Sequence, residues 1–243
     1  MAFIDIHHHL LFGVDDGPRD WEETRLSLHH AADGGIGAIV ATPHADVSRR
    51  PFNMESCRDQ IHQIEQYCAD ERLPLRVTLG AELFCREPLT VDSIVKRLDS
   101  GDAPTLAATR FVLLEFPIDM AFDKMVRIAE RFLSGGYWPI LAHIERYACL
   151  VQKPGNIGQL REFRDLRLQV NCNTLIAPFG FTMRRFIKRA VESGWIDYAA
   201  TDAHDRVYRP VRMKECHETL SRRYGAEVAD ALCGGNQMEV VGD

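Results

Sequence analysis

The stretch Ile4-Asp5-Ile6-His7-His8-His9, which runs on to Val14-Asp15-Asp16-Gly17-Pro18, lies almost at the N-terminus. Its apolar residues predict a buried strand that ends in histidines. Because side chains alternate along a strand, His7 and His9 point the same way and could share one metal ion. A surface histidine cluster or part of an expression tag is the alternative, although apolar neighbours make a poor tag. The residues at the ends of the other predicted strands distinguish between these interpretations.

The composition excludes several classes of protein. The chain has 243 residues, a length that fits one large domain or two small ones, and 46% of them are hydrophobic, which is ample for a core. A formal net charge of −6 gives no electrostatic footprint for nucleic acid. No apolar run approaches the roughly 20 residues of a membrane span, and no signal peptide is recognisable. The seven cysteines form no Cys-x-x-Cys pair. We therefore expect a cytoplasmic protein without nucleic-acid partners and without direct membrane insertion.

Compact apolar runs alternate with helical patterns along the whole chain. After the opening strand, buried strands are expected at 38–41, 75–79, 111–114, 138–142, 166–170 and 198–201. Between them, Asp20 with Glu23 predicts a helix start, and Thr182 is expected to cap a later helix that stops at Gly194. Strict alternation of strand and helix predicts a parallel sheet with right-handed crossovers.

Seven such units that close on themselves would form a barrel one unit short of the eightfold α/β barrel. An open, doubly wound sheet is the alternative. Against it, no glycine-rich phosphate loop follows the first strand, where dinucleotide-binding proteins place one.

Residues able to bind metal follow six of the seven predicted strands. They are His7 and His9, His44, Glu82, Glu115, His143, and Asp202 with His204, whereas the remaining strand ends in Asn171. In a parallel barrel these ends lie on one face, where the loops after the strands build the active site. Core packing gives no reason for imidazoles and carboxylates there. The set exceeds the ligands of one tetrahedral ion, so it predicts two or three ions of Zn, Mn or Fe, bridged by carboxylates.

Two arginines follow these strand ends closely. Arg146 lies three residues beyond His143, and Arg209 lies five residues beyond His204. Planar guanidinium groups bind phosphate oxygens bidentately, although either arginine could instead form a surface salt bridge. Clustered divalent ions create hydroxide near neutral pH and stabilise the attacking and leaving oxygens of a phosphoryl displacement. These residues together predict the hydrolysis of a phosphate ester.

The strand ends carry short motifs in a fixed order: DIHHH, VDDGP, ATPH, GAE, LLEF, AHIERY and TDAH. In this order they resemble the polymerase-and-histidinol-phosphatase (PHP) superfamily. More closely, they resemble the bacterial manganese-dependent tyrosine-protein phosphatases of capsule and exopolysaccharide operons. The resemblance implies an α/β fold, a distorted (βα)7 TIM-like barrel (the PHP fold), with residues 1–243 as a single phosphatase domain. It also implies three divalent metal ions at the C-terminal ends of the strands, Mn²⁺ being expected and Zn²⁺ or Fe the alternatives.

The resemblance further implies which residues hold each ion. His7, His9, Glu82 and Asp202 would hold the first; Glu82, Glu115 and His143 the second, with Glu82 bridging; and Asp16, His44 and His204 the third. Asp15 lies close enough to leave the choice of Asp16 open. Arg146 and Arg209 match the family's phosphate-binding arginines. The loop at 45–52 differs from the family's usual stretch, so substrate contacts cannot be transferred there, and His8 is expected to point away from the metals.

The implied reaction is the hydrolysis of phosphotyrosine in protein by a metal-bridging hydroxide. The implied substrate is the tyrosine-rich tail of a membrane-associated bacterial tyrosine kinase that controls polysaccharide synthesis and export. The alternatives are a small-molecule phosphatase such as histidinol-phosphatase, a metal-dependent amidohydrolase, and a non-catalytic metal-binding module that regulates a partner. A cysteine phosphatase is a further alternative because Cys216 and Arg222 match Cys-x5-Arg. The residues between them contain no glycine for a phosphate loop and lie in a predicted helix.

Overall fold

The computed structural model describes residues 2–242, so the first and last residues of the expected domain lie outside the described part. Its strands are β1 (Phe3–His8), β2 (Ile36–Ala41), β3 (His44–Ala45), β4 (Arg76–Leu79), β5 (Glu82–Phe84), β6 (Phe111–Glu115), β7 (Trp138–Leu141), β8 (Arg167–Asn171) and β9 (Tyr198–Ala200). Only Thr42-Pro43 separates β2 from β3, and only Gly80-Ala81 separates β4 from β5. These two interrupted strands and the five continuous ones confirm the seven predicted strands.

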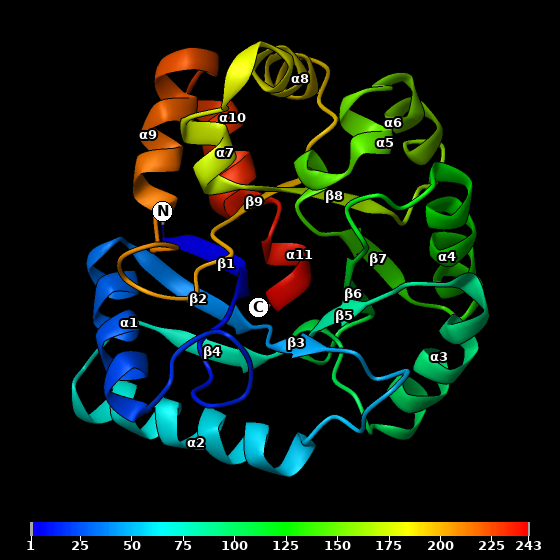
Figure 1. The fold of residues 1–243 in the computed structure, drawn as a ribbon. Helices are drawn as coiled ribbons and strands as arrows, with labels where there is room; N and C mark the ends of the chain where they lie inside the picture. Colours follow the sequence, from blue (N-terminus) through cyan, green and yellow to red (C-terminus); the bar gives the residue numbers. More distant parts are fainter. Residues whose placement is uncertain (1, 243) are drawn as a thin grey trace.

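The strands pair in parallel and follow the order of the chain. One ladder has the order β1-β2-β4, and the other has the order β3-β5-β6-β7-β8-β9. Backbone hydrogen bonds from Gly80 N to Ala41 O (2.8 Å) and from Glu82 N to Pro43 O (3.1 Å) continue the sheet from one ladder to the other. A parallel bridge between His8 and Ala203 brings β1 beside the end of β9, so the sheet curls into the ring seen in Figure 1. The TIM-like barrel is confirmed and the open sheet is excluded.

Helices lie outside this ring (Figure 1). They are α1 (Trp21–Asp33), α2 (Met54–Asp70), α3 (Val91–Ser100), α4 (Phe122–Ser134), α5 (Ala148–Val151), α6 (Gly155–Leu160), α7 (Cys172–Ile176), α8 (Gly180–Glu192), α9 (Met213–Tyr224) and α10 (Ala226–Asp230). The short helix α11 (Met238–Val241) instead lies near the centre of the ring (Figure 1). The 3₁₀ turns are η1 (Pro88–Thr90), η2 (Leu106–Ala108) and η3 (Ile144–Arg146), and η4 (Ala231–Gly235) is a π-helical turn. None of the helices in residues 2–242 is long and apolar enough to span a bilayer.

The core has two parts because the side chains of each strand alternate between the two faces of the sheet. In β6, Val112 and Leu114 face the helices, whereas Phe111 and Leu113 face the inside of the ring. The inner cluster also receives Val240 and Val241 from α11. The C-terminal segment therefore fills the inside of the ring, while the opposite ends of the strands remain available for polar side chains.

One predicted helix start is correct and another is wrong. The Asp20 carboxylate accepts a hydrogen bond from Glu23 N at 3.0 Å and caps α1 as expected. Thr182 does not cap α8, which begins at Gly180. Gly180 has a φ of +77°, a conformation that glycine adopts without strain, so the chain turns into the helix before Thr182 is reached.

Replacing Asp20 by alanine is expected to lower the free energy of unfolding by about 1 kcal/mol, because Glu23 N loses its acceptor. Denaturation in urea measures the difference. Asp33→Ala is the matched control at the other end of α1, where a carboxylate opposes the helix dipole and its removal should cost nothing. Equal unfolding free energies for the Asp20 variant and the unaltered protein would contradict the assigned cap.

Candidate metal centre

The histidines at the end of β1 are positioned by an irregularity in the strand. The register between β1 and β2 shifts between Asp5 and His8. As a result Ile6 lies in the inner cluster while His7 also reaches carboxylates inside the ring, and His8 faces outward. His8 Nε2 lies 3.2 Å from Ser27 Oγ on α1, and its Nδ1 lies 3.2 Å from Asp5 Oδ2. The expectation that His8 points away from the site is confirmed.

The first group of donors surrounds Glu82 and Asp202. His7 Nε2 lies 3.3 Å from Glu82 Oε1 and 3.4 Å from Asp202 Oδ1. His9 Nε2 lies 3.4 Å from Glu82 Oε2 and 3.3 Å from His7 Nε2. All four side chains are buried, although they come from β1, β5 and the end of β9. The structure thus brings together the four residues expected for the first ion.

The second group shares Glu82 with the first. His143 Nε2 lies 2.9 Å from Glu82 Oε1 and 3.7 Å from Glu115 Oε1. His44 Nδ1 approaches the other Glu82 oxygen at 2.9 Å and Glu115 Oε2 at 3.6 Å. Glu82 therefore lies between imidazoles on several sides, as a bridging carboxylate would.

The third group decides between the two neighbouring aspartates. Asp16 Oδ1 lies 3.2 Å from His204 Nε2 and 3.4 Å from His44 Nε2. Asp15 is occupied elsewhere: its Oδ2 lies 2.6 Å from His9 Nδ1 and accepts from His44 N, and its Oδ1 accepts from Gly17 N. The geometry therefore favours Asp16 as the donor, and Asp15 orients His9 and His44.

Gly17 follows this pair because a side chain has no room there. A Cβ atom at this position would lie 2.9 Å from His9 O and 3.0 Å from Asp15 Oδ1. The turn that presents the two aspartates therefore requires glycine.

The residues that orient these donors were not predicted from the sequence. Gln169 Oε1 accepts from His143 N at 2.7 Å and lies 3.3 Å from His7 Nδ1. Its amide nitrogen donates to Asn171 Oδ1, and Asn171 Nδ2 donates to Asp202 Oδ2 at 2.7 Å. The sequence feature that could have indicated this role is a polar glutamine between the apolar residues of β8.

Two of the donor positions carry backbone strain. His143 has a φ of +34° and Asp202 a φ of +52°, a region that residues with a Cβ rarely adopt. Such conformations cost about 1–3 kcal/mol each and concentrate at functional sites. Tyr147 supports His143, because its hydroxyl lies 3.4 Å from His143 Nδ1 and accepts a hydrogen bond from Phe116 N.

The charges of these groups depend strongly on one another. Burial lowers the pKa of His7, but the carboxylates of Glu82 and Asp202 outweigh this effect and raise it to about 9. Burial would raise the pKa of Glu82, but His7 and the other surrounding imidazoles hold it well below its usual range. Burial and the charge of Glu82 raise the pKa of Glu115 to about 7. Protonated imidazoles thus balance the carboxylates, a role that a bound divalent cation takes over.

The donors fit divalent cations. Among the described residues, three groups have donor atoms within 4.8 Å of one another: His7, His9 and Glu82; His44, Glu82 and Glu115; and His9, Asp16, His44 and His204. Within residues 2–242, the buried atoms Glu82 Oε2 and His204 Nε2 form no hydrogen bond of acceptable geometry, although His44 Nδ1 and Asp16 Oδ1 lie 2.9 and 3.2 Å from them. Burial, His9 and Arg209 lower the pKa of His204 to about 3, which leaves its nitrogen unprotonated for a metal. Mixed imidazole and carboxylate donors suit Mn, Zn or Fe.

The two arginines expected at the site both form ion pairs with Asp202. Arg146 Nη2 lies 2.6 Å from Asp202 Oδ2, and Arg209 Nη2 lies 2.8 Å from Asp202 Oδ1. Both guanidinium groups are partly exposed, so each can also reach a ligand from solvent.

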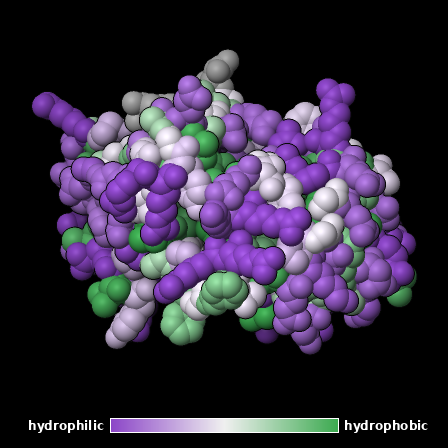
Figure 2. All heavy atoms as spheres, turned by 90° about the horizontal axis from the view of Figure 1, so that it is seen from above, coloured by the Kyte–Doolittle hydropathy of each residue, from purple (hydrophilic) through white to green (hydrophobic). Residues whose placement is uncertain are grey.

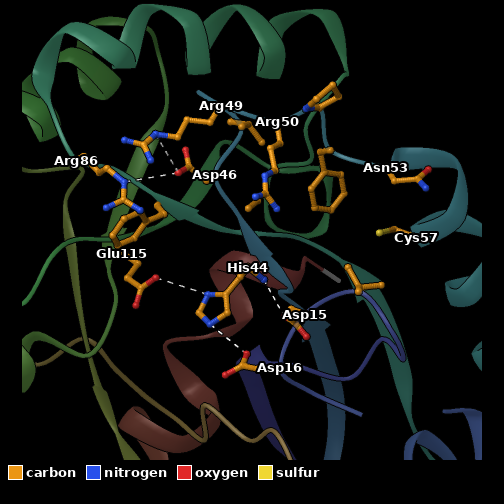
Figure 3. Close-up of a pocket in the computed structure, with 16 residues that line it drawn as sticks. Asp15, Asp16, His44, Asp46, Arg49, Arg50, Asn53, Cys57, Arg86 and Glu115 are labelled. Atoms are coloured by element: carbon orange, nitrogen blue, oxygen red, sulfur yellow. Dashed lines mark hydrogen bonds and ion pairs between the residues drawn. The ribbon is translucent and has the colours of Figure 1, made fainter. Parts of the chain in front are cut away.

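A cavity of about 740 Å³ opens beside these donors (Figure 3). Asp16, His44 and Glu115 line one side of it. Its wall also includes the apolar side chains of Val14, Val47, Phe52 and Phe84, and the guanidinium groups of Arg49, Arg50 and Arg86. In the segments that follow β5, β6, β8 and β9, including the turn η1 and the start of α8, large apolar side chains are exposed: Leu89, Ile118, Phe179, Phe181, Val207 and Tyr208. The side of the molecule seen in Figure 2 is largely hydrophilic, with hydrophobic side chains along its lower edge.

The cysteine-phosphatase alternative is not supported. Cys216 lies within α9 and is fully buried. Its hydrogen bond with Cys172, together with burial, raises the pKa of this thiol well above its usual range. A buried, protonated thiol in a helix cannot serve as a phosphate-binding nucleophile.

A curled parallel sheet with imidazoles and carboxylates at the C-terminal ends of its strands defines the class of barrel-shaped hydrolases that use metal ions. Residues 3–242 match the family described as capsular polysaccharide synthesis, CpsB/CapC. The chain belongs to this family.

Individual relatives agree with this assignment. The chain is 29% identical to the tyrosine-protein phosphatase CpsB of Streptococcus pneumoniae, an alignment that covers 99% of this chain and 98% of the relative. It is 30% identical to the tyrosine-protein phosphatase YwqE of Bacillus subtilis (strain 168), with 93% and 86% covered. A crystal structure from work on YwqE and CpsB, described as metal-dependent tyrosine phosphatases, has a TM-score of 0.86 at 26% identity and covers 98% of this chain and 94% of that one. The expected resemblance to capsule-operon tyrosine phosphatases is confirmed.

A lactonase from Listeria monocytogenes shares only the fold. Its structure has a TM-score of 0.64 at 12% identity, and the match covers 99% of this chain and 94% of that one.

Proposed function

We propose that this chain is a metal-dependent phosphatase that hydrolyses phosphotyrosine in proteins. The observation that carries the proposal is the set of donor groups sharing Glu82, with Arg146 and Arg209 at its edge. Membership of the CpsB/CapC family and the names of the relatives point to the same activity. We further propose that residues 1–243 act as a single phosphatase domain.

We propose three divalent ions, Mn²⁺ being the first candidate. His7, His9, Glu82 and Asp202 would hold one ion, Glu82, Glu115 and His143 a second, and Asp16, His44 and His204 a third. Bound divalent ions supply an activated water near neutral pH and compensate the charge that develops on phosphate oxygens. Short distances between imidazole and carboxylate atoms support this assignment: 3.4 Å from His7 to Asp202, 2.9 Å from His143 to Glu82, and 3.2 Å from His204 to Asp16.

The protein's own residues then bind and orient the phosphate. Arg146 and Arg209 both donate hydrogen bonds to the Asp202 carboxylate, so their guanidinium groups lie close together. Non-bridging phosphate oxygens would accept hydrogen bonds from both groups there. The apolar wall formed by Val47, Phe52 and Phe84 suits a tyrosyl ring. Phenolate, with a pKa of about 10, leaves with less help from an acid than an alkoxide does.

The substrate is proposed to be a membrane-associated bacterial tyrosine kinase of polysaccharide synthesis. The family description links the chain to capsular polysaccharide synthesis, and its tyrosine-protein phosphatase relatives act on phosphorylated protein.

A comparison of substrates tests the proposed function. With Mn²⁺ present, the protein should hydrolyse a phosphotyrosine peptide faster than histidinol phosphate, and a chelator should abolish both rates. Cys216→Ser should leave the rates and the effect of the chelator unchanged, because the buried thiol takes no part. Activity that survives complete removal of metal, or a preference for histidinol phosphate, would overturn the proposal.

A further inference from the structure

Three arginines line the cavity without a role in the proposed reaction. Arg49 and Arg50 belong to the loop between β3 and α2, and Arg86 follows β5. Figure 3 shows them across the cavity from Asp16 and His44, and we call them the arginine cluster. The whole chain has a formal net charge of −6, so this local excess of positive charge is not a general property of the protein.

The guanidinium groups of the arginine cluster are only loosely paired. Asp46 Oδ2 lies 3.8 Å from Arg49 Nε and 3.6 Å from Arg86 Nε, and Asp46 Oδ1 already accepts a hydrogen bond from Ser48. Within residues 2–242 the side chain of Arg50 forms no ion pair or hydrogen bond, and it extends into the cavity (Figure 3). Asp46 is therefore shared by Arg49 and Arg86 through their Nε atoms, and the terminal N–H groups of the cluster remain available to a ligand.

Arg86 is also held in place without using its N–H donors. Its guanidinium carbon lies 4.2 Å from the centre of the Phe84 ring, a cation–π contact that fixes the plane of the group. A fixed guanidinium plane loses less side-chain entropy when it binds an oxyanion. The same cavity holds Glu115 and His44, so one bound molecule can contact both the donors and the arginine cluster.

We infer that the arginine cluster binds a second anionic group of the substrate, a carboxylate or a phosphate near the phosphotyrosine in the same peptide. This inference rests on the proposed function, because the first anion is the phosphate that is hydrolysed. Guanidinium groups match the oxygens of both carboxylates and phosphates. A substrate with only one negative group would leave the cluster with Asp46 as its shared carboxylate, so the cluster selects acidic or multiply phosphorylated segments.

The test compares three peptides that differ at one position beside the phosphotyrosine. That position holds alanine, aspartate, or a phosphonate analogue of phosphotyrosine that cannot be hydrolysed. For the unaltered protein with Mn²⁺, kcat/KM should be about five- to tenfold higher for an anionic neighbour than for alanine. A gain with the phosphonate alone identifies a second phosphate as the natural ligand, and a gain with both shows that a carboxylate suffices.

The variant Arg49→Gln/Arg50→Gln/Arg86→Gln should bring the ratio between anionic and alanine peptides to about one. Arg127→Gln on the outer helix α4 is the matched control and should keep the ratio of the unaltered protein. Arg50→Glu should lower the ratio and favour a peptide with lysine at the variable position. High salt should reduce the preference of the unaltered protein, a measurement that needs no variant.

Equal kcat/KM values for the three peptides with the unaltered protein, or a preference that survives in the triple variant, would overturn the inference. Failure of the proposed function gives a different result, because the metal-loaded protein would then hydrolyse none of the peptides.

Discussion

Replacing Glu82 by glutamine should lower kcat/KM for a phosphotyrosine peptide by about a thousandfold or more, which corresponds to about 4 kcal/mol of transition-state stabilisation. Glu82 belongs to two of the three donor groups, and its two oxygens contact His7 and His143 on one side and His9 and His44 on the other. Glutamine keeps the volume but removes the negative charge and one of the two acceptor oxygens. Both donor groups therefore lose a ligand in a single substitution.

The matched control is Glu239→Gln. Glu239 pairs with Arg167 at the start of β8, at the end of the sheet away from the donors, so its loss should leave kcat/KM within about twofold of the unaltered value. Circular dichroism of both variants should show the helix content of the unaltered protein. A Glu82→Gln protein that is folded and retains more than a tenth of the activity would contradict the assignment of Glu82 as a shared ligand.

Replacing Arg146 or Arg209 by alanine should lower kcat/KM by about a hundredfold each, while the metal content stays unchanged. The two guanidinium groups contact different oxygens of Asp202, so their N–H groups converge from two sides. Lysine at either position should restore only part of the activity, because a point charge replaces a planar fork. Steady-state kinetics and elemental analysis of the same samples separate loss of phosphate binding from loss of metal.

Arg161→Ala is the matched control for the Arg146 and Arg209 variants, because it also removes a paired, partly exposed arginine. Its side chain is 35% exposed, close to the 38% of Arg146, and it pairs with Asp197 outside the site. We expect little change in kcat/KM for this variant. If the Arg146 and Arg209 variants lost metal together with activity, these residues would support the ion site through Asp202 and would not be phosphate-binding residues.

Sequence patterns were sufficient for the fold and for the positions of the donors. Buried apolar runs predicted each strand, and residues able to bind metal at the ends of six of them predicted a common face. This works because parallel strands necessarily place their carboxyl ends on the same side. The choice of Asp16 over Asp15 was beyond the sequence, since it depends on which oxygen reaches His9 and which reaches His204.

Other features depend on contacts between distant parts of the chain. The register shift in β1 lets His7 and Ile6 both face inward, which strict alternation would not predict. In the sequence Gln169 resembles any other strand residue. Its role follows only from the closed ring, which places its side chain against His7 and His143. The position of Val240 inside the ring likewise depends on a contact between the C-terminal segment and strands that are distant in the sequence. The Thr182 cap was wrong because a glycine turn competes successfully with a side-chain cap.

We propose that the donor groups at the strand ends hold the ions needed for phosphatase activity. The most direct test is a titration of the metal-free protein with Mn²⁺, in which bound metal and turnover of a phosphotyrosine peptide are measured on the same samples. We expect binding to approach three equivalents per chain, one for each donor group, with turnover rising as they fill. Full turnover before any metal is added, or saturation with metal without any turnover, would contradict this role of the donor groups.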